Sequence, residues 1–172
     1  SDIGEVSPGQ FLMVRCGDEC LLSRPFSIHQ TDSKGITLLF SVWEEGKGTN
    51  WLSQRRVGDS VNLLGPLGNG FSISPDSKNL LLVAGGVGIA PLRFLAERAL
   101  SGGCSVTLLL GTKTQAQLDP TLLRMSPEIR LVMATEDGTA GKKGKVTELL
   151  PDFVDRADQI FASGPVPMYR DI

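Results

Sequence analysis

The hydrophobic pattern divides the chain into two parts of different texture. In the first part, short segments rich in β-forming residues are bounded by glycine, proline and aspartate. Such segments are typical of β-strands, and their short connections favour an antiparallel barrel or sandwich. The expected strands are GQFLMVR (9–15), RPFSIHQ (24–30), GITLLFSV (35–42) and DSVNLLGPLG (59–68), with one short helical candidate at 48–56.

The second part begins with a continuous apolar run, NLLLVA (79–84). A run of this kind is expected of a strand buried on both faces of a parallel sheet. The next segment repeats apolar residues at helical spacing, as at Leu92, Leu95 and Ala99, which predicts a helix with one apolar face. Pro91 fits the first turn of that helix. Further strands are predicted at 104–110, 129–134 and 159–163.

This alternation of strands and helices indicates an α/β doubly wound parallel sheet. The change of texture falls in the polar stretch SPDSKN (74–79). The sequence therefore predicts an all-β antiparallel domain over residues 1–75 and an α/β domain over residues 76–172.

Composition and charge exclude several classes of protein. The net charge of −2 argues against a nucleic-acid binder, which would show a basic patch and a high pI. No run approaches the roughly 18 to 20 apolar residues that a membrane span needs, and no secretion signal is visible at the N-terminus. We expect a cytoplasmic protein that binds neither nucleic acid nor membrane.

The cysteines do not predict a metal site. Cys16 and Cys20 form an isolated C-x₃-C, Cys104 is distant, and His29 is the only histidine. A zinc or iron–sulfur site needs about four ligands, which this set does not supply. Two packed thiols are the favoured interpretation of Cys16 and Cys20, in a reducing compartment.

A glycine-rich turn follows the first strand of the second part. In VAGGVGIAPL (83–92), Gly85, Gly86 and Gly88 let the backbone approach a ligand without Cβ clashes. The N–H groups of the following helix offer positive potential to a phosphate. Pro91 stands in place of the third Rossmann glycine, and no acidic residue ends the next strand. Taken alone, the turn fits a tight connection as well as a nucleotide site.

Six motifs follow one another in an order that resembles a known family. They are RPFSI (24–28), GKGTNWLSQ (46–54), LGPLGNGF (64–71), GGVGIAPL (85–92), EDGTAGKKGKVT (136–147) and SGPVPM (163–168). This order resembles the ferredoxin–NADP-reductase-like flavoproteins, and within them the electron-transfer subunits of NAD-dependent dihydroorotate dehydrogenase. The resemblance runs from Pro8 to Ile172. It implies a flavin-binding antiparallel β-barrel followed by a nicotinamide-binding α/β domain, in agreement with the two textures.

The resemblance implies that FAD lies along the first domain. Arg24 would pair with the pyrophosphate, because a guanidinium fork suits phosphate oxygens. Ser27 would lie near the flavin ring, where a hydroxyl donor tunes the electronics of N5. The N–H groups of the helix that Gly48 and Thr49 open could bind the other phosphate edge, while Trp43 fits a core aromatic as well as a ring beside the cofactor. The implied FAD-binding residues are Arg24, Pro25, Phe26, Ser27, Ser41, Val42, Trp43, Gly48 and Thr49.

The resemblance places NAD(H) on the second domain. Glu136 and Asp137 could accept hydrogen bonds from ribose or nicotinamide, the alternative being a solvated acidic turn. Ser163 would face nicotinamide C4 and flavin N5. Together with Ser27, which would lie near the flavin ring, it is an implied catalytic residue. The implied NAD-binding residues are Gly85, Gly86, Gly88, Ile89, Ala90, Pro91, Gly111, Thr112, Glu136, Asp137, Gly138, Ser163, Gly164 and Pro165.

Three features depart from the family pattern. Ser163 stands where the family usually carries cysteine, and a hydroxyl is smaller and less polarizable than a thiol. No cysteine follows Cys104, whereas the family's subunit ends in a cysteine-rich [2Fe–2S] segment. The family also begins with about two further β segments before its PGQF motif. We therefore expect a fragment with an incomplete barrel, and a [2Fe–2S] cluster only in a segment after Ile172.

The resemblance implies an NAD(H)-dependent flavoprotein oxidoreductase subunit. Hydride would pass between nicotinamide and FAD, and single electrons would then move toward the iron–sulfur centre. The implied partner, in a hetero-oligomer, is the catalytic dihydroorotate dehydrogenase subunit of pyrimidine biosynthesis. Two alternatives stay open. One is the flavin subunit of a hydrogenase or an NADPH–ferredoxin oxidoreductase, in which Lys113 would meet a 2′-phosphate. The other is an interaction module without a cofactor.

Overall fold

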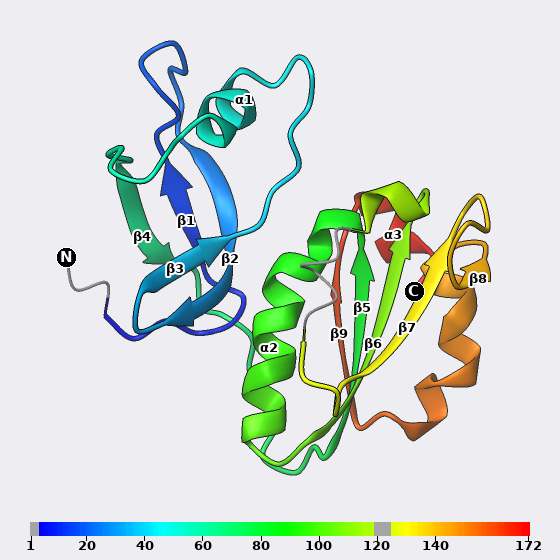
Figure 1. The fold of residues 1–172 in the computed structure, drawn as a ribbon. Coiled ribbons are helices and arrows are strands. Elements are labelled where there is room, and N and C mark those ends of the chain that lie inside the picture. The colour runs from blue at the N-terminus through cyan, green and yellow to red at the C-terminus, as the bar shows by residue number, and fades with distance from the viewer. Residues whose placement is uncertain (1–3, 119–124) are drawn as a thin grey trace. The chain divides into compact units, whose positions relative to one another are not determined.

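The chain divides into two compact units, Ser1–Phe71 and Ser72–Ile172. A computed structural model describes residues 4–118 and 125–172 (Figure 1). Every strand pair described in the first unit is antiparallel, and every pair described in the second unit is parallel. The expected change from an antiparallel β unit to a parallel α/β unit is confirmed.

Four strands form the antiparallel sheet of the first unit, in the order β3-β2-β1-β4. The buried side chains of this sheet include Leu12, Val14, Phe26 and Ile28. The turn from β2 to β3 is closed by Asp32, whose carboxylate accepts hydrogen bonds from the N–H groups of the next residues. The elements are β1 (Phe11–Val14), β2 (Arg24–Asp32), β3 (Gly35–Leu38), β4 (Leu63–Leu67) and α1 (Lys47–Ser53).

Four elements of the first unit are shorter than the sequence predicted, among them the strands expected over 9–15 and 59–68, which are β1 and β4. The strand expected over 35–42 ends at Leu38, where its partner in β2 is Ile28. Strand β3 therefore does not pair with the residues of β2 that precede Ile28. The first of these residues line the cavity described below. The helix expected over 48–56 is α1, which ends at Ser53.

Five strands form the parallel sheet of the second unit, in the order β8-β7-β6-β5-β9. The chain proceeds from β5 outward to β8 and then returns to place β9 on the other side of β5 (Figure 1). This reversal makes the carboxyl ends of β5 and β9 the topological switch point, where ligands bind in open α/β sheets. The strands are β5 (Asn79–Gly85), β6 (Ser105–Thr112), β7 (Arg130–Thr135), β8 (Lys142–Lys143) and β9 (Gln159–Ser163).

Helical segments cover both faces of this sheet. Helix α2 (Ile89–Ser101) packs on β5, β6 and β9, while the 3₁₀ segment η3 (Val146–Asp152) packs on β5, β6 and β7 (Figure 1). Side chains of a strand alternate between its faces. Leu81 and Val83 accordingly share a core cluster with Val146 of η3. The doubly wound arrangement is therefore confirmed, with a core on each side of the strands.

The connections of the second unit were the least predictable part. The segment from β7 to β9 contains the short strand β8, η3 and a further 3₁₀ turn η4 (Val154–Arg156), with Pro151 inside η3. The chain then ends in the five-residue helix α3 (Val166–Arg170). In the described residues, no helix has both the length and the apolar character needed to cross a membrane.

Asp158 ties the start of β9 to the start of β5, and this link predicts a pH dependence. Its carboxylate accepts hydrogen bonds from the N–H groups of Lys78 and Asn79, at 2.8 and 2.7 Å. These bonds lower the pKa of Asp158 below its ordinary value of 3.8. The stabilisation is therefore fully present above that value and is lost as the pH falls through the lower, folded pKa.

Below about pH 4, we expect the stability of the Asp158→Asn variant to fall less steeply with decreasing pH than that of the parent. The measurement is the urea midpoint of unfolding over a pH series. Asp155→Asn is the control, because Asp155 is exposed and accepts no side-chain hydrogen bond within the described residues. Parallel acid profiles for the parent and Asp158→Asn would contradict the assignment.

Candidate functional site

A cavity of about 650 Å³ opens in the first unit, and six predicted FAD-binding residues line it. Strand β2 supplies three of them, the loop before α1 supplies one, and the beginning of α1 supplies two. The structure thus brings together segments that the sequence separates. These six residues are Arg24, Pro25, Phe26, Trp43, Gly48 and Thr49.

Three predicted residues lie outside this cavity wall. Ser27 is half-buried and is paired with Phe11 of β1, while Ser41 and Val42 are exposed in the loop after β3. Ser27 directly follows Phe26, the last residue of β2 that lines the wall. The structure does not bring Ser27, Ser41 or Val42 together with the other six.

Most of the remaining wall comes from residues that sequence reasoning missed. The connection between β1 and β2 contributes apolar side chains at the rim, where Leu21 is 86% exposed. Trp43, a predicted residue, is 71% exposed. Exposed apolar side chains around a cavity of this size suit a flat, apolar ligand. The wall residues not predicted are Glu19, Cys20, Leu21, Leu22, Glu45, Gly46 and Lys47.

Arg24 provides the wall with a cation that forms no ion pair with a carboxylate of the described residues. Among the described residues, the ion pairs join Arg55 to Asp59 and Lys145 to Asp171, and neither involves Arg24. A second cation, Lys47, lines the same wall, as do the carboxylates of Glu19 and Glu45. An exposed guanidinium without a partner is suited to bidentate pairing with phosphate oxygens.

The beginning of α1 packs closely against the connection between β1 and β2. A Cβ at Gly48 would lie 3.3 Å from Cβ of Cys16 and 3.5 Å from Cγ of Arg24. Cys16 and Cys20 are both buried free thiols. Burial is the main cause that raises the pKa of the Cys16 thiol, and the nearby Cys20 raises it further. The Cys16 thiol is therefore neutral at pH 7 and serves as packing beneath the wall.

Asn50 holds the loop that carries Trp43. Its side-chain amide donates hydrogen bonds to the carbonyl oxygens of Trp43 at 2.6 Å and Gly46 at 3.1 Å. An amide with two N–H donors can serve several carbonyls at once. Asn50 therefore fixes the position of the wall although it does not line the cavity. The GKGTNWLSQ segment alone did not predict this contact.

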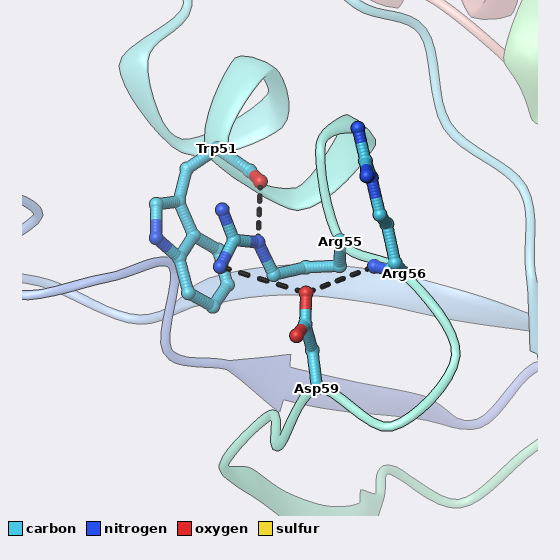
Figure 2. Close-up of polar contacts among 4 residues, drawn as sticks. All are labelled: Trp51, Arg55, Arg56 and Asp59. Carbon is cyan, nitrogen blue, oxygen red and sulfur yellow. Dashed lines mark hydrogen bonds and ion pairs between the residues drawn. The ribbon is translucent and has the colours of Figure 1, made fainter.

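A second cluster anchors α1 from its carboxyl end (Figure 2). The guanidinium of Arg55 lies 4.3 Å from the Trp51 ring centroid, and its Nε donates to the Trp51 carbonyl at 3.1 Å. Asp59 closes the following turn by accepting a hydrogen bond from the Arg56 N–H at 2.9 Å. The Trp51 ring in turn packs on Gly17, in the same connection that supplies the cavity rim. The cluster therefore holds two parts of the wall together.

The second group of predicted residues lies at the carboxyl edge of the parallel sheet. Gly85 is level with Gly111 in the next strand, and Ala84 is level with Ser163 on the other side. The turns after β5, β6, β7 and β9 therefore begin at the same edge. This edge carries the predicted NAD-binding residues of those four turns.

Gly88 allows the start of α2 to pack directly on the turn after β9. A Cβ at Gly88 would collide with the carbonyl oxygen of Ser163 and would lie 2.8 Å from the nitrogen of Gly164. Gly86, by contrast, has φ +54° and open space where its Cβ would be. Gly88 is thus required by close packing, and Gly86 by its backbone conformation.

The three residues after Gly88 were also predicted to bind NAD. Ile89, Ala90 and Pro91 are buried in the core of the unit. The helical run that begins at Gly86 has no side-chain cap at either recorded N-cap, Gly85 or Gly88. A helix start whose N-cap is glycine leaves room for an anionic group at this edge.

The polar side chains of the other two turns already have local partners. The Thr112 hydroxyl donates to the carbonyl oxygen of Thr114 at 3.0 Å. The Asp137 carboxylate accepts hydrogen bonds from the N–H and the hydroxyl of Thr139, and these bonds lower the pKa of Asp137. Asp137 is therefore an ionised residue of a local turn, while its neighbour Glu136 is exposed without such a bond among the described residues.

The chain is similar to a defined set of known proteins. Residues 3–71 match the family model for the oxidoreductase FAD-binding domain. A protein from Desulforamulus reducens, "Dihydroorotate dehydrogenase B (NAD(+)), electron transfer subunit", is 41% identical over 96% of this chain and 64% of its own length. A protein of the same name from Listeria innocua is 34% identical over 99% of this chain and 68% of its own length. The chain thus spans about two thirds of these relatives.

A solved structure shows the same fold. The structure of an NADH-dependent reduced ferredoxin–NADP oxidoreductase matches with a TM-score of 0.80 and 30% identity. The match covers 95% of this chain and 59% of the other. The antiparallel FAD-binding unit followed by a parallel five-stranded α/β unit is therefore a ferredoxin-reductase-like fold.

Proposed function

Because the chain belongs to the family of electron-transfer subunits of NAD-dependent dihydroorotate dehydrogenase, we propose that it binds FAD in its first unit and NAD(H) in its second. The cofactors held by these residues would supply hydride-transfer chemistry. The observation that carries the proposal is the 650 Å³ cavity, in which Arg24 has no carboxylate partner in the part of the chain that the structure describes and apolar side chains stay exposed. A flat apolar ring attached to a pyrophosphate would satisfy both features.

The residues of the first unit bind and orient FAD in this proposal. The flavin supplies the chemistry, since it accepts two electrons as hydride and can release them one at a time. Arg24 pairs with the pyrophosphate, and Gly48 and Thr49 present backbone to the same group. Pro25, Phe26 and Trp43 contact apolar surface of the cofactor. The catalytic role of Ser27, and the contacts of Ser41 and Val42, stay proposals that rest on the family resemblance.

The residues of the second unit bind and orient the nicotinamide nucleotide. The start of the helical run from Gly86, close to Ile89 and Ala90, would hold the pyrophosphate. Gly111, Thr112 and the turn from Glu136 to Gly138 border the adjacent ribose. The turn Ser163–Gly164–Pro165 borders the nicotinamide, with Ser163 nearest the reacting carbon.

The wider reaction also belongs to this proposal. The relatives are named as subunits, so we infer that this chain passes single electrons onward within a complex. The proposed recipients are a [2Fe–2S] centre and then the catalytic subunit that acts on dihydroorotate, in the cytoplasm. The cluster and the partner rest on the family resemblance, because the chain spans only part of the relatives.

The direct test is the colour and reactivity of the purified protein. The protein loaded with FAD should be yellow, and NADH should bleach it faster than NADPH under anaerobic conditions. The family resemblance favours NADH, and if Glu136 and Asp137 border the ribose as proposed, their negative charge would oppose a 2′-phosphate. Stopped-flow absorbance with each nucleotide makes the comparison.

Two results would change the assignment. A protein that stays colourless in excess FAD would favour the interaction module. A preference for NADPH would move the chain to the NADPH–ferredoxin group, in which Lys113→Ala should selectively slow reduction by NADPH.

Ser163 gives a second expected result. If its side chain borders the reacting carbon, Ser163→Cys should raise the rate of flavin reduction while the affinity for NADH changes little. Hydride transfer is sensitive to small displacements, because a misplacement of about 1 Å can cost roughly 100-fold. Single-turnover reduction by NADH measures both parameters, and equal rates in the two proteins would refute the catalytic role.

A further inference from the structure

The peptide group between Ser163 and Gly164 is held from one side by α2. A Cβ at Gly88 would collide with the Ser163 carbonyl oxygen, so this oxygen lies against the start of the helix with no side chain between them. A trans peptide places its carbonyl oxygen and its N–H on opposite sides of the bond. The N–H of Gly164 therefore points away from Gly88.

Tyr169 holds the opposite side of the same peptide. The Gly164 N–H donates a hydrogen bond to the Tyr169 hydroxyl oxygen at 3.1 Å. The next residue, Pro165, has no N–H that could take the place of this donor. The direction of the Ser163–Gly164 peptide thus depends on two contacts, Gly88 at the oxygen and Tyr169 at the nitrogen.

The helix that carries Tyr169 is itself fixed against this turn. Met168 is buried, and its N–H donates to the Pro165 carbonyl at 2.9 Å. A Cβ at either Gly85 or Gly164 would lie 2.9 Å from the Met168 sulfur, so α3 packs on the ends of both β5 and β9. The Tyr169 ring is half-exposed, which leaves its hydroxyl as its one polar link to the turn.

We propose that Tyr169 is a positioning residue for the nicotinamide: its hydroxyl binds the Gly164 N–H and thereby fixes the direction of the neighbouring Ser163. The inference rests on the proposed function, in which Ser163 borders the reacting carbon. Tyr169 does not touch the reacting atoms in this account. It limits rotation of the peptide that joins Ser163 to a glycine, the residue with the greatest backbone freedom.

The test is Tyr169→Phe in the full chain loaded with FAD, since phenylalanine keeps the ring and removes only the hydroxyl. Loss of one neutral hydrogen bond should speed amide hydrogen exchange at Gly164 by about threefold to tenfold, measured by ¹⁵N NMR without NADH. The rate of flavin reduction by NADH should fall about tenfold, from misorientation of Ser163. The NADH dissociation constant should change less than about twofold, because nucleotide binding is spread over several turns.

Val166→Ala is the matched control, because Val166 is an exposed apolar residue of the same helix. It should leave Gly164 exchange and the reduction rate at parent values. If NADH does not reduce the parent, the proposed function fails. If the parent is reduced but Tyr169→Phe keeps the parent rate or the parent Gly164 exchange, the role of Tyr169 is overturned. Equal melting temperatures for parent and variant show that the change is local.

Discussion

Replacing Arg24 by alanine is expected to weaken FAD binding by roughly 30-fold to several thousand-fold. The guanidinium lines the cavity and has no carboxylate partner within residues 4–118 and 125–172, so in the proposed complex it can pair with the pyrophosphate. Removing one member of a hydrogen-bonded charge pair costs on the order of 2 to 5 kcal/mol, much of it as the unpaired charge that remains. The measurement is the ratio of flavin to protein after dialysis, followed by titration with FAD.

Two further variants make the Arg24 result specific. Arg24→Lys keeps the charge but loses the planar fork, so its affinity should fall between those of parent and alanine variant. Arg56→Ala removes an exposed arginine of the same unit that does not line the cavity, and it should retain parent affinity. Stoichiometric flavin in dialysed Arg24→Ala would show that the pyrophosphate binds elsewhere.

Gly88→Ala should abolish measurable reduction of the flavin by NADH while leaving flavin binding unchanged. A Cβ at this position collides with backbone, the Ser163 carbonyl oxygen, which cannot move aside as a side chain can. The start of α2 and the turn after β9 must then separate, at a cost of about 1 to 3 kcal/mol in the free energy of unfolding. A shift of about 1 Å in the turn that borders the nicotinamide would slow hydride transfer roughly 100-fold.

Gly102→Ala is the matched control for this substitution. Gly102 ends the same helix, and a Cβ there would lie 3.3 Å from the carbonyl oxygen of Ala99 and 3.5 Å from that of Arg98, without the collision seen at Gly88. The control should keep the parent rate with NADH. Thermal unfolding separates a local change from loss of the second unit, and a folded Gly88→Ala protein with the parent rate would remove the turn from the nucleotide site.

The sequence predicted those features that depend on short-range pattern. The continuous apolar run at 79–84 and the glycine turn after it became β5 and the start of α2, because a strand buried on both faces has no polar position. The spacing of Leu92, Leu95 and Ala99 placed the buried face of α2 correctly. The alternation in RPFSI also predicted that Arg24 and Phe26 lie on the same face of β2.

The rest of the flavin cavity depends on contacts between segments with no common pattern. Leu21 and Leu22 reach the rim because Trp51 packs on Gly17 in the connection between β1 and β2, and nothing in either segment indicates the other. The link from Asn50 to the Trp43 carbonyl is equally invisible in sequence. Strand β8 and helix α3 were missed because two and five residues are too few for a period to appear.

The strand order of the second unit has a consequence for how the protein is made. Strand β9 pairs with β5, yet it leaves the ribosome only after β6, β7 and β8. Until then, one edge of the apolar strand β5 has no partner, and unpaired apolar edges invite association with other chains. The turn that meets Gly88 arrives with β9, so a nascent chain cannot build the nucleotide edge early. Slow synthesis through residues 113–158 would therefore lengthen the period in which a chaperone is most useful.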